Sequence, residues 1–155
     1  TFFRSFAACR VRIALNFRGL AAAERYVHLR RGGGEQYGPD FAAPNPAARI
    51  PVLRDGNPVL AQPLAIIEHR DETHPETPLL PGDPERRALA RSFVPAVACE
   101  IHPPNNLRAI QYLRDPLGLD PATRDLWYRH WVGTGLGASK TAVTQAGRAP
   151  DAPAH

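Results

Sequence analysis

The chain has 155 residues and a formal net charge of +4 at pH 7, which suits one domain or two small ones. It has no apolar run long enough to cross a bilayer, which excludes a membrane-spanning protein, and no nucleic-acid-binding motif accompanies its scattered arginines. Two cysteines far apart in sequence, Cys9 and Cys99, do not make a disulfide framework. We therefore expect a cytoplasmic protein with neither a membrane nor a nucleic acid as partner.

Strand and helix patterns alternate at the start of the chain, which places this part in the α/β class. The order is strand, helix, strand, followed by a glycine-rich loop and a short helix. The predicted elements are the end of a strand at Phe2 and Phe3, a helix from Ala7 that Gly19 ends, a strand over 26–29 and a helix after Glu35.

A β-hairpin and a helix follow. Pro51-Val52-Leu53 and Pro58-Val59-Leu60 flank Asp55-Gly56, which is a strong hairpin signal. The next helix runs to about Glu72, so residues 1–75 read as βαβ-ββα.

A proline-rich stretch separates this domain from a helical one. We expect a linker over 76–84 and helices over 85–145. The first helix starts at Asp83-Pro84, since Asp caps helices well and Pro suits the first helical position.

Several residues should weaken the helical domain. Pro95 should kink or break the first helix at a cost of roughly 3 kcal/mol. The last helix starts at Asp120-Pro121, and Gly133, Gly135 and Gly137 each weaken it by roughly 1 kcal/mol relative to alanine. Residues 146–155 form a Pro/Ala-rich tail that we expect to be disordered.

Ser5 and Cys9 are the candidate reactive residues near the first helix. The Ser5 hydroxyl either caps the helix or donates a hydrogen bond to a thiolate at the helix N-terminus, where N–H groups favour negative charge. Cys9 is either an inert, partly buried thiol or the thiol of an oxidoreductase, although no second cysteine follows at redox-motif spacing. The histidines show no metal-ligand spacing, so no metal site is predicted.

A set of motifs over residues 2–142 resembles the zeta-class glutathione transferases, which include bacterial maleylacetoacetate and maleylpyruvate isomerases. The motifs are Phe3-Arg4-Ser5, Arg10-Val11-Arg12-Ile13-Ala14-Leu15-Asn16, Ala43-Pro44-Asn45-Pro46, Ile50-Pro51-Val52-Leu53, Ala65-Ile66-Ile67-Glu68, Asp71-Glu72-Thr73-His74-Pro75, Ile101-His102-Pro103, Asn105-Asn106-Leu107-Arg108 and Trp127-Tyr128-Arg129-His130-Trp131.

The resemblance implies a fold and a reaction. The fold is a thioredoxin-like N-terminal domain followed by an all-α domain, here incomplete, and the intact family forms homodimers. The reaction, in aromatic compound and tyrosine catabolism, is glutathione-dependent cis–trans isomerisation of a maleyl dianion. Glutathione thiolate adds to the double bond, the bond rotates, and elimination leaves the fumaryl isomer.

The resemblance also implies site residues. Ser5 stabilises the thiolate, and Arg4 and Arg10 are candidates for the substrate carboxylates, with Arg10 also counted as catalytic. Glutathione is held through backbone, side-chain and helix N-terminal groups from both domains. These residues are Ser5, Gln36, Ile50, a cis Pro51, Gln62, Pro63, His102, Asn106 and Arg108.

This chain departs from the family pattern at several positions. Phe6, Ala7 and Ala8 replace small polar residues, and Arg70 replaces an apolar one. Pro63 replaces a serine, which removes a hydroxyl and an N–H from the γ-glutamyl site. At roughly 1.5–3 kcal/mol per bond, glutathione should bind about tenfold to hundredfold more weakly for each bond lost.

Two hypotheses of different class follow. In the first, the chain is a truncated isomerase, and the absence of methionine suggests that it is a fragment. In the second, it is a degenerate family fragment that binds glutathione weakly or not at all. The second is supported by Pro63, Ala7, Ala8, Pro95 and the family helices missing at the end of the chain. Which maleyl compound is used is left open.

Overall fold

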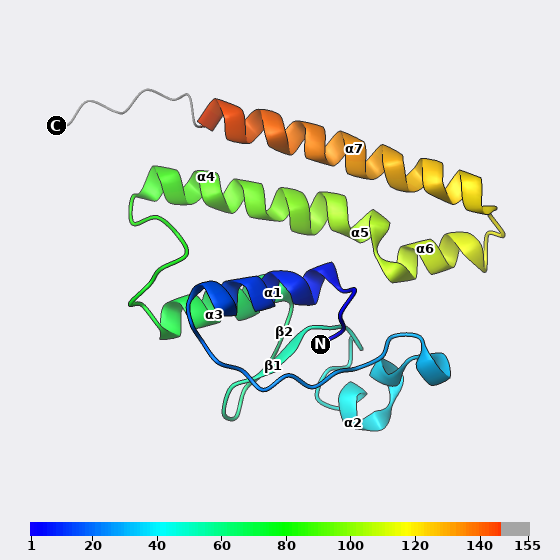
Figure 1. Ribbon diagram of the computed structural model, residues 1–155, viewed down its shortest axis with the longest axis horizontal. Helices are drawn as coiled ribbons and strands as arrows, with labels where there is room; N and C mark the ends of the chain where they lie inside the picture. Colours follow the sequence, from blue (N-terminus) through cyan, green and yellow to red (C-terminus); the bar gives the residue numbers. More distant parts are fainter. Residues whose placement is uncertain (147–155) are drawn as a thin grey trace. The chain divides into compact units, whose positions relative to one another are not determined.

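The computed structural model describes residues 1–146, and the chain divides into a unit over 1–79 and a second unit from Leu80 onward (Figure 1). No helix within residues 1–146 has both the length and the apolar character needed to span a lipid bilayer. The tail predicted to be disordered from residue 146 lies, beyond Ala146 itself, outside the described residues.

The first unit combines a small antiparallel sheet with helices and two 3₁₀ turns. Its elements are α1 (Phe6–Phe17), η1 (Arg31–Gly33), η2 (Glu35–Tyr37), α2 (Pro39–Ala42), β1 (Val52–Arg54), β2 (Val59–Ala61) and α3 (Pro63–Thr73).

The hairpin forms where the sequence predicts it. Val52 pairs with Ala61 and Arg54 with Val59 across an antiparallel ladder, and Gly56 in the turn has a φ of +64°. A glycine adopts this left-handed conformation without steric cost. The hairpin prediction is confirmed.

Helices α1 and α3 pack side by side, and α3 also contacts both strands (Figure 1). Ile66 of α3 is fully buried, and Ala8 and Val11 are the buried residues of α1. Arg18, the C-cap of α1, is ion-paired with Asp71 in the last turn of α3. Because the two helices differ in length by one residue and their C-terminal ends are paired, their N-terminal ends lie at the same end of the unit.

The two strands predicted before and after α1 do not form as regular strands. Residues 3 and 4 make a turn, which leaves too few extended residues for a ladder. Two hydrogen bonds join these segments instead. The Thr1 amine donates to the Arg25 carbonyl at 2.6 Å, and the Val27 N–H donates to the Thr1 carbonyl at 2.8 Å. A residue that bonds in this way to the residues on either side of its neighbour is typical of parallel pairing.

The second unit is helical within the described residues. Its elements are α4 (Pro84–Pro95), the π-helical segment η3 (Ala96–Ile101), α5 (His102–Asn105), α6 (Leu107–Arg114) and α7 (Pro121–Ala146). Asp83 caps α4 as predicted, with its Oδ1 accepting the Arg86 N–H at 2.8 Å. At Pro95 the α-helix gives way to the π-helical turn, because proline supplies no N–H for the α-helical ladder.

The long helix α7 runs unbroken through its three glycines, each of which we expected to weaken it without breaking it. Gly135 lies so close to η3 that an added Cβ would sit 2.2 Å from Cγ1 of Ile101, whereas nothing lies within 4 Å of Gly133 or Gly137. The close packing of α7 against η3 therefore requires a glycine at position 135.

Candidate functional site

Ser5 is the N-cap of α1. Its backbone is extended, and its half-buried Oγ accepts a hydrogen bond from the Ala8 N–H at 3.1 Å. A serine hydroxyl has one donor proton and two acceptor lone pairs. Capping uses one of the two acceptor lone pairs of the hydroxyl. The hydroxyl proton makes no hydrogen bond to another group among residues 1–146. The two interpretations of Ser5, cap and thiolate donor, are therefore compatible in one geometry.

Gln62 and Pro63 stand at the start of α3. Gln62 is the N-cap, with no side-chain capping bond and a φ of +73°, and Pro63 is at the first helical position. A non-glycine residue in this region is strained by about 1–3 kcal/mol, which is typical of ligand-binding positions. Since Pro63 has no N–H and Ile66 bonds to the Gln62 carbonyl, the N–H groups of Leu64 and Ala65 are the donors left at this end.

The Ile50–Pro51 peptide bond is cis, and both residues are buried. Asn45, itself buried, fixes the preceding loop by donating from Nδ2 to the Arg49 carbonyl at 2.8 Å. The backbone N–H and carbonyl of Ile50 make no hydrogen bond within residues 1–146, so they remain open to an extended peptide.

Gln36 lies in η2 and is 6% exposed. Its Nε2 reaches the Leu29 carbonyl only at 3.5 Å, and its Oε1 is buried without a partner among the described residues. An unpaired buried acceptor costs about 1–3 kcal/mol, so a ligand N–H that reached it would bind favourably.

The other predicted site residues differ in exposure and in unit. Arg4 is exposed in the turn before α1, and Arg10 is half-buried on α1. His102 begins α5, Asn106 caps α6 by accepting the Ala109 N–H at 3.1 Å, and Arg108 is exposed on α6. The first unit thus supplies Arg4, Ser5, Arg10, Gln36, Ile50, Pro51, Gln62 and Pro63, and the second supplies His102, Asn106 and Arg108.

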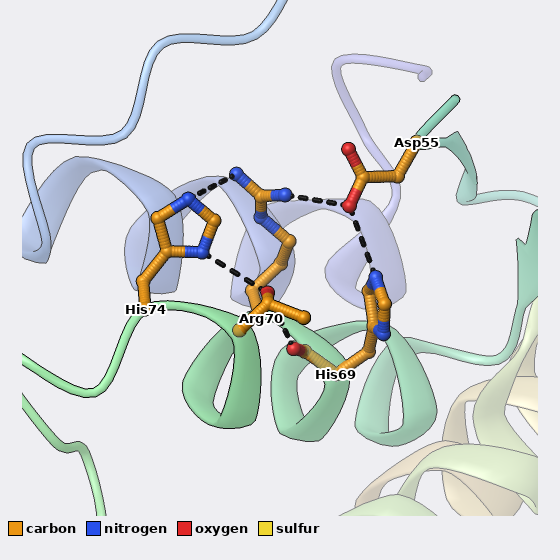
Figure 2. Close-up of polar contacts among 5 residues, drawn as sticks. Asp55, His69, Arg70 and His74 are labelled. Carbon is orange, nitrogen blue, oxygen red and sulfur yellow. Dashed lines mark hydrogen bonds and ion pairs between the residues drawn. The ribbon is translucent and has the colours of Figure 1, made fainter.

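The structure also contains a polar network that the sequence did not predict (Figure 2). Asp55 in the hairpin turn accepts hydrogen bonds from Arg70 Nη1 at 2.7 Å and from His69 Nε2 at 3.0 Å. Both hydrogen bonds lower the pKa of Asp55, and the bond from His69 has the larger effect. Arg70 Nη2 also lies 3.2 Å from His74 Nε2, so the network joins the hairpin to α3.

The first unit matches a known protein family. Residues 2–78 match the glutathione S-transferase N-terminal domain. A probable maleylacetoacetate isomerase of Vibrio cholerae is 47% identical over 135 residues, which is 87% of this chain and 63% of that protein. The maleylacetoacetate isomerase of Pseudomonas aeruginosa is 40% identical over 148 residues, which is 95% of this chain and 69% of that protein. The chain therefore spans about two thirds of the length of these relatives.

Solved structures of similar proteins have the same fold as this chain. The maleylacetoacetate isomerase of Methylobacterium extorquens, with bound malonate and glutathione, matches with a TM-score of 0.83 and 42% identity. A holo maleylpyruvate isomerase, described as a bacterial zeta-class glutathione S-transferase, matches with a TM-score of 0.80 and 39% identity. Each match covers 88% of this chain and 64% of the other.

The fold, a thioredoxin-like unit followed by helices, is that of the glutathione S-transferases, as the sequence predicted. The chain belongs to the zeta-class glutathione S-transferase family, the family of maleylacetoacetate and maleylpyruvate isomerases.

Proposed function

We propose that this chain binds glutathione through its first unit. The observation that carries the proposal is the shared direction of α1 and α3, whose N-terminal ends lie together because Arg18 and Asp71 pair at their C-terminal ends. Helix N-termini attract anions through unpaired N–H groups and the helix dipole. Glutathione carries two suitable anions close together, the cysteinyl thiolate and the γ-glutamyl carboxylate.

In this proposal the thiolate lies at α1 and the carboxylate at α3. The free proton of Ser5 is donated to the thiolate, which stabilises the ionised form and lowers the thiol pKa. The N–H groups of Leu64 and Ala65 bind the carboxylate beside Gln62, without the N–H and hydroxyl that a serine at position 63 would add. Ile50 pairs its backbone with the cysteinyl residue, and Gln36 binds the glycyl end.

We further propose that the reaction is cis–trans isomerisation of maleylacetoacetate or maleylpyruvate, within aromatic compound catabolism. When bound, glutathione supplies the thiolate that adds reversibly to the maleyl double bond. Arg4 and Arg10 hold the substrate carboxylates. The family resemblance supports His102, Asn106 and Arg108 as further glutathione ligands and a homodimer as the assembly. The names of the relatives and the malonate and glutathione in one of the solved structures support this assignment.

The test is turnover of both maleyl compounds by the purified, folded chain with and without glutathione. We expect a glutathione-dependent rate with at least one of them. A folded chain that gives no rate above the uncatalysed reaction would contradict the isomerase assignment.

One observation favours a second candidate, a degenerate family member that binds glutathione weakly or not at all and no longer catalyses. Pro63 starts α3 well but lacks the N–H through which its position would bind an anion. A cooperative melt that millimolar glutathione leaves unshifted would support this candidate. A melt that glutathione shifts upward would support the binding proposal.

A further inference from the structure

The loop over 28–35 is closed at its base by His28 and Glu35. The Glu35 N–H donates to the His28 carbonyl at 2.9 Å, and the Glu35 Oε2 accepts the His28 N–H at 2.6 Å. These two bonds bring the ends of the loop together, but they leave the residues between them to be fixed by other contacts.

The imidazole of His28 fixes the first turn of this loop. Its Nδ1 accepts the backbone N–H of Arg30 at 3.2 Å and that of Arg31 at 2.9 Å, so Nδ1 carries no proton in this arrangement. The ring also lies edge-on to Phe2, with ring centroids 5.3 Å apart. A side-chain acceptor of this kind holds a turn that backbone pairing alone does not specify.

The rest of the loop has little stiffness of its own. Gly32, Gly33 and Gly34 all have positive φ, and three such glycines allow many alternative conformations. The Gly34 N–H donates to the Arg31 carbonyl at 2.9 Å, so the turn held by His28 also sets the position of Gly34.

Gly34 in turn forms the surface on which the Gln36 amide rests. A Cβ at Gly34 would lie 2.6 Å from Gln36 Nε2 and 2.9 Å from Oε1, so the buried amide lies directly against the glycine. A continuous series of contacts therefore leads from the His28 ring through Arg31 and Gly34 to Gln36, whose Oε1 has no partner among residues 1–146.

We propose that His28 is a positioning residue for the glycyl end of glutathione. Its imidazole holds the loop in the conformation that presents the Gln36 amide, and it thereby sets how well the site distinguishes glutathione from γ-glutamylcysteine, which lacks the glycine. This inference rests on the proposed function, because it takes Gln36 as a glutathione ligand.

The experiment is calorimetric titration of the full chain with glutathione and with γ-glutamylcysteine. The variants are His28→Phe, which keeps a ring against Phe2 but removes the acceptor, and His28→Asn, whose side-chain oxygen can replace Nδ1. Gln36→Ala and the double variant His28→Phe/Gln36→Ala show whether the two residues act through one path. Circular dichroism melts verify that each variant is folded.

We expect the unmodified chain to bind glutathione about tenfold more tightly than γ-glutamylcysteine, the effect of one good hydrogen bond. His28→Phe should lose most of this preference with its γ-glutamylcysteine affinity unchanged. His28→Asn should recover the preference, and the double variant should be no worse than Gln36→Ala.

Other outcomes overturn the inference at different levels. A His28→Phe chain that keeps the preference, or that binds both peptides more weakly by the same factor, contradicts a positioning role for His28. An unmodified chain that binds both peptides equally contradicts the Gln36 assignment and with it this inference, while leaving thiolate binding intact. A folded unmodified chain that binds neither peptide overturns the proposed function and this inference together.

Discussion

The Ser5 hydroxyl caps α1 by accepting the Ala8 N–H, and this bond leaves its proton free to donate. Asp83 caps α4 with the same pattern, since its carboxylate accepts the N–H three residues along the chain. The two caps differ in one respect that matters for function: a carboxylate has no proton to donate, whereas a hydroxyl does.

Replacing these caps in turn separates capping from thiolate binding. Ser5→Ala and Asp83→Ala should each lower the free energy of unfolding by about 1 kcal/mol. Only Ser5→Ala should raise the thiol pKa of bound glutathione, by about 1 to 2 pH units, because it removes a hydrogen bond to the charged form. Thiolate absorbance in the ultraviolet measures this pKa. An unchanged value in Ser5→Ala would restrict Ser5 to capping.

Pro63 limits glutathione affinity in this account. Pro63→Ser restores a hydroxyl and an N–H at the start of α3, so glutathione should bind about tenfold or more tightly in calorimetry. Pro84→Ser makes the same chemical change at the first position of α4 and should leave the affinity unchanged. Equal affinities of the Pro63→Ser chain and the unmodified chain would remove position 63 from the site.

The glycines of α7 provide a test of packing. Gly135→Ala should destabilise the chain, because overpacking against Ile101 costs about 1–3 kcal/mol and exceeds the gain of about 1 kcal/mol in helix propensity. Gly133→Ala has open space around it and should stabilise by about 0.5–1 kcal/mol. Urea unfolding of both variants measures the difference. Similar free energies for the two would contradict the close approach of α7 and η3.

The Asp55 network predicts a pH-dependent contribution to stability. The folded-state pKa of Asp55 lies below its ordinary value of 3.8, so its ionised form stabilises the fold above that pH. The contribution is lost as the pH falls through the folded-state pKa.

Asp55→Asn should therefore lower the melting temperature near neutral pH, and this difference should shrink below pH 3.8. Glu76→Gln, which removes an exposed carboxylate without a hydrogen bond or ion pair in the described part of the chain, is the control. A loss in Asp55→Asn that stays constant down to low pH would show that its charge does not stabilise the fold.

The sequence predicted the features that local chemistry determines. The Asp55-Gly56 turn, the Asp83 cap and the disruption at Pro95 depend on residues close together in the chain, and all three are present. The cis bond before Pro51 was expected only from the family resemblance, because a trans bond is the common state before proline.

Features that depend on distant residues were missed. Arg70 was unexpected on its helix, but its partner Asp55 lies on the hairpin. Gly135 was expected only to weaken α7, but the contact with Ile101 requires a glycine there. The strand predicted over 26–29 does not form as a regular strand. Its sequence pattern does not show that the N-terminal segment with which it would pair turns away at residues 3 and 4. The burial of Gln36 depends on Gly34 and Leu29 and was likewise not visible in the sequence.

Calorimetric titration of the purified chain with glutathione tests the central claim most directly. We predict saturable binding at one site per chain, weakened by Ser5→Ala and strengthened by Pro63→Ser. A folded chain that gives no binding heat at millimolar glutathione, and whose melting temperature glutathione does not raise, would contradict the claim that α1 and α3 form a glutathione site.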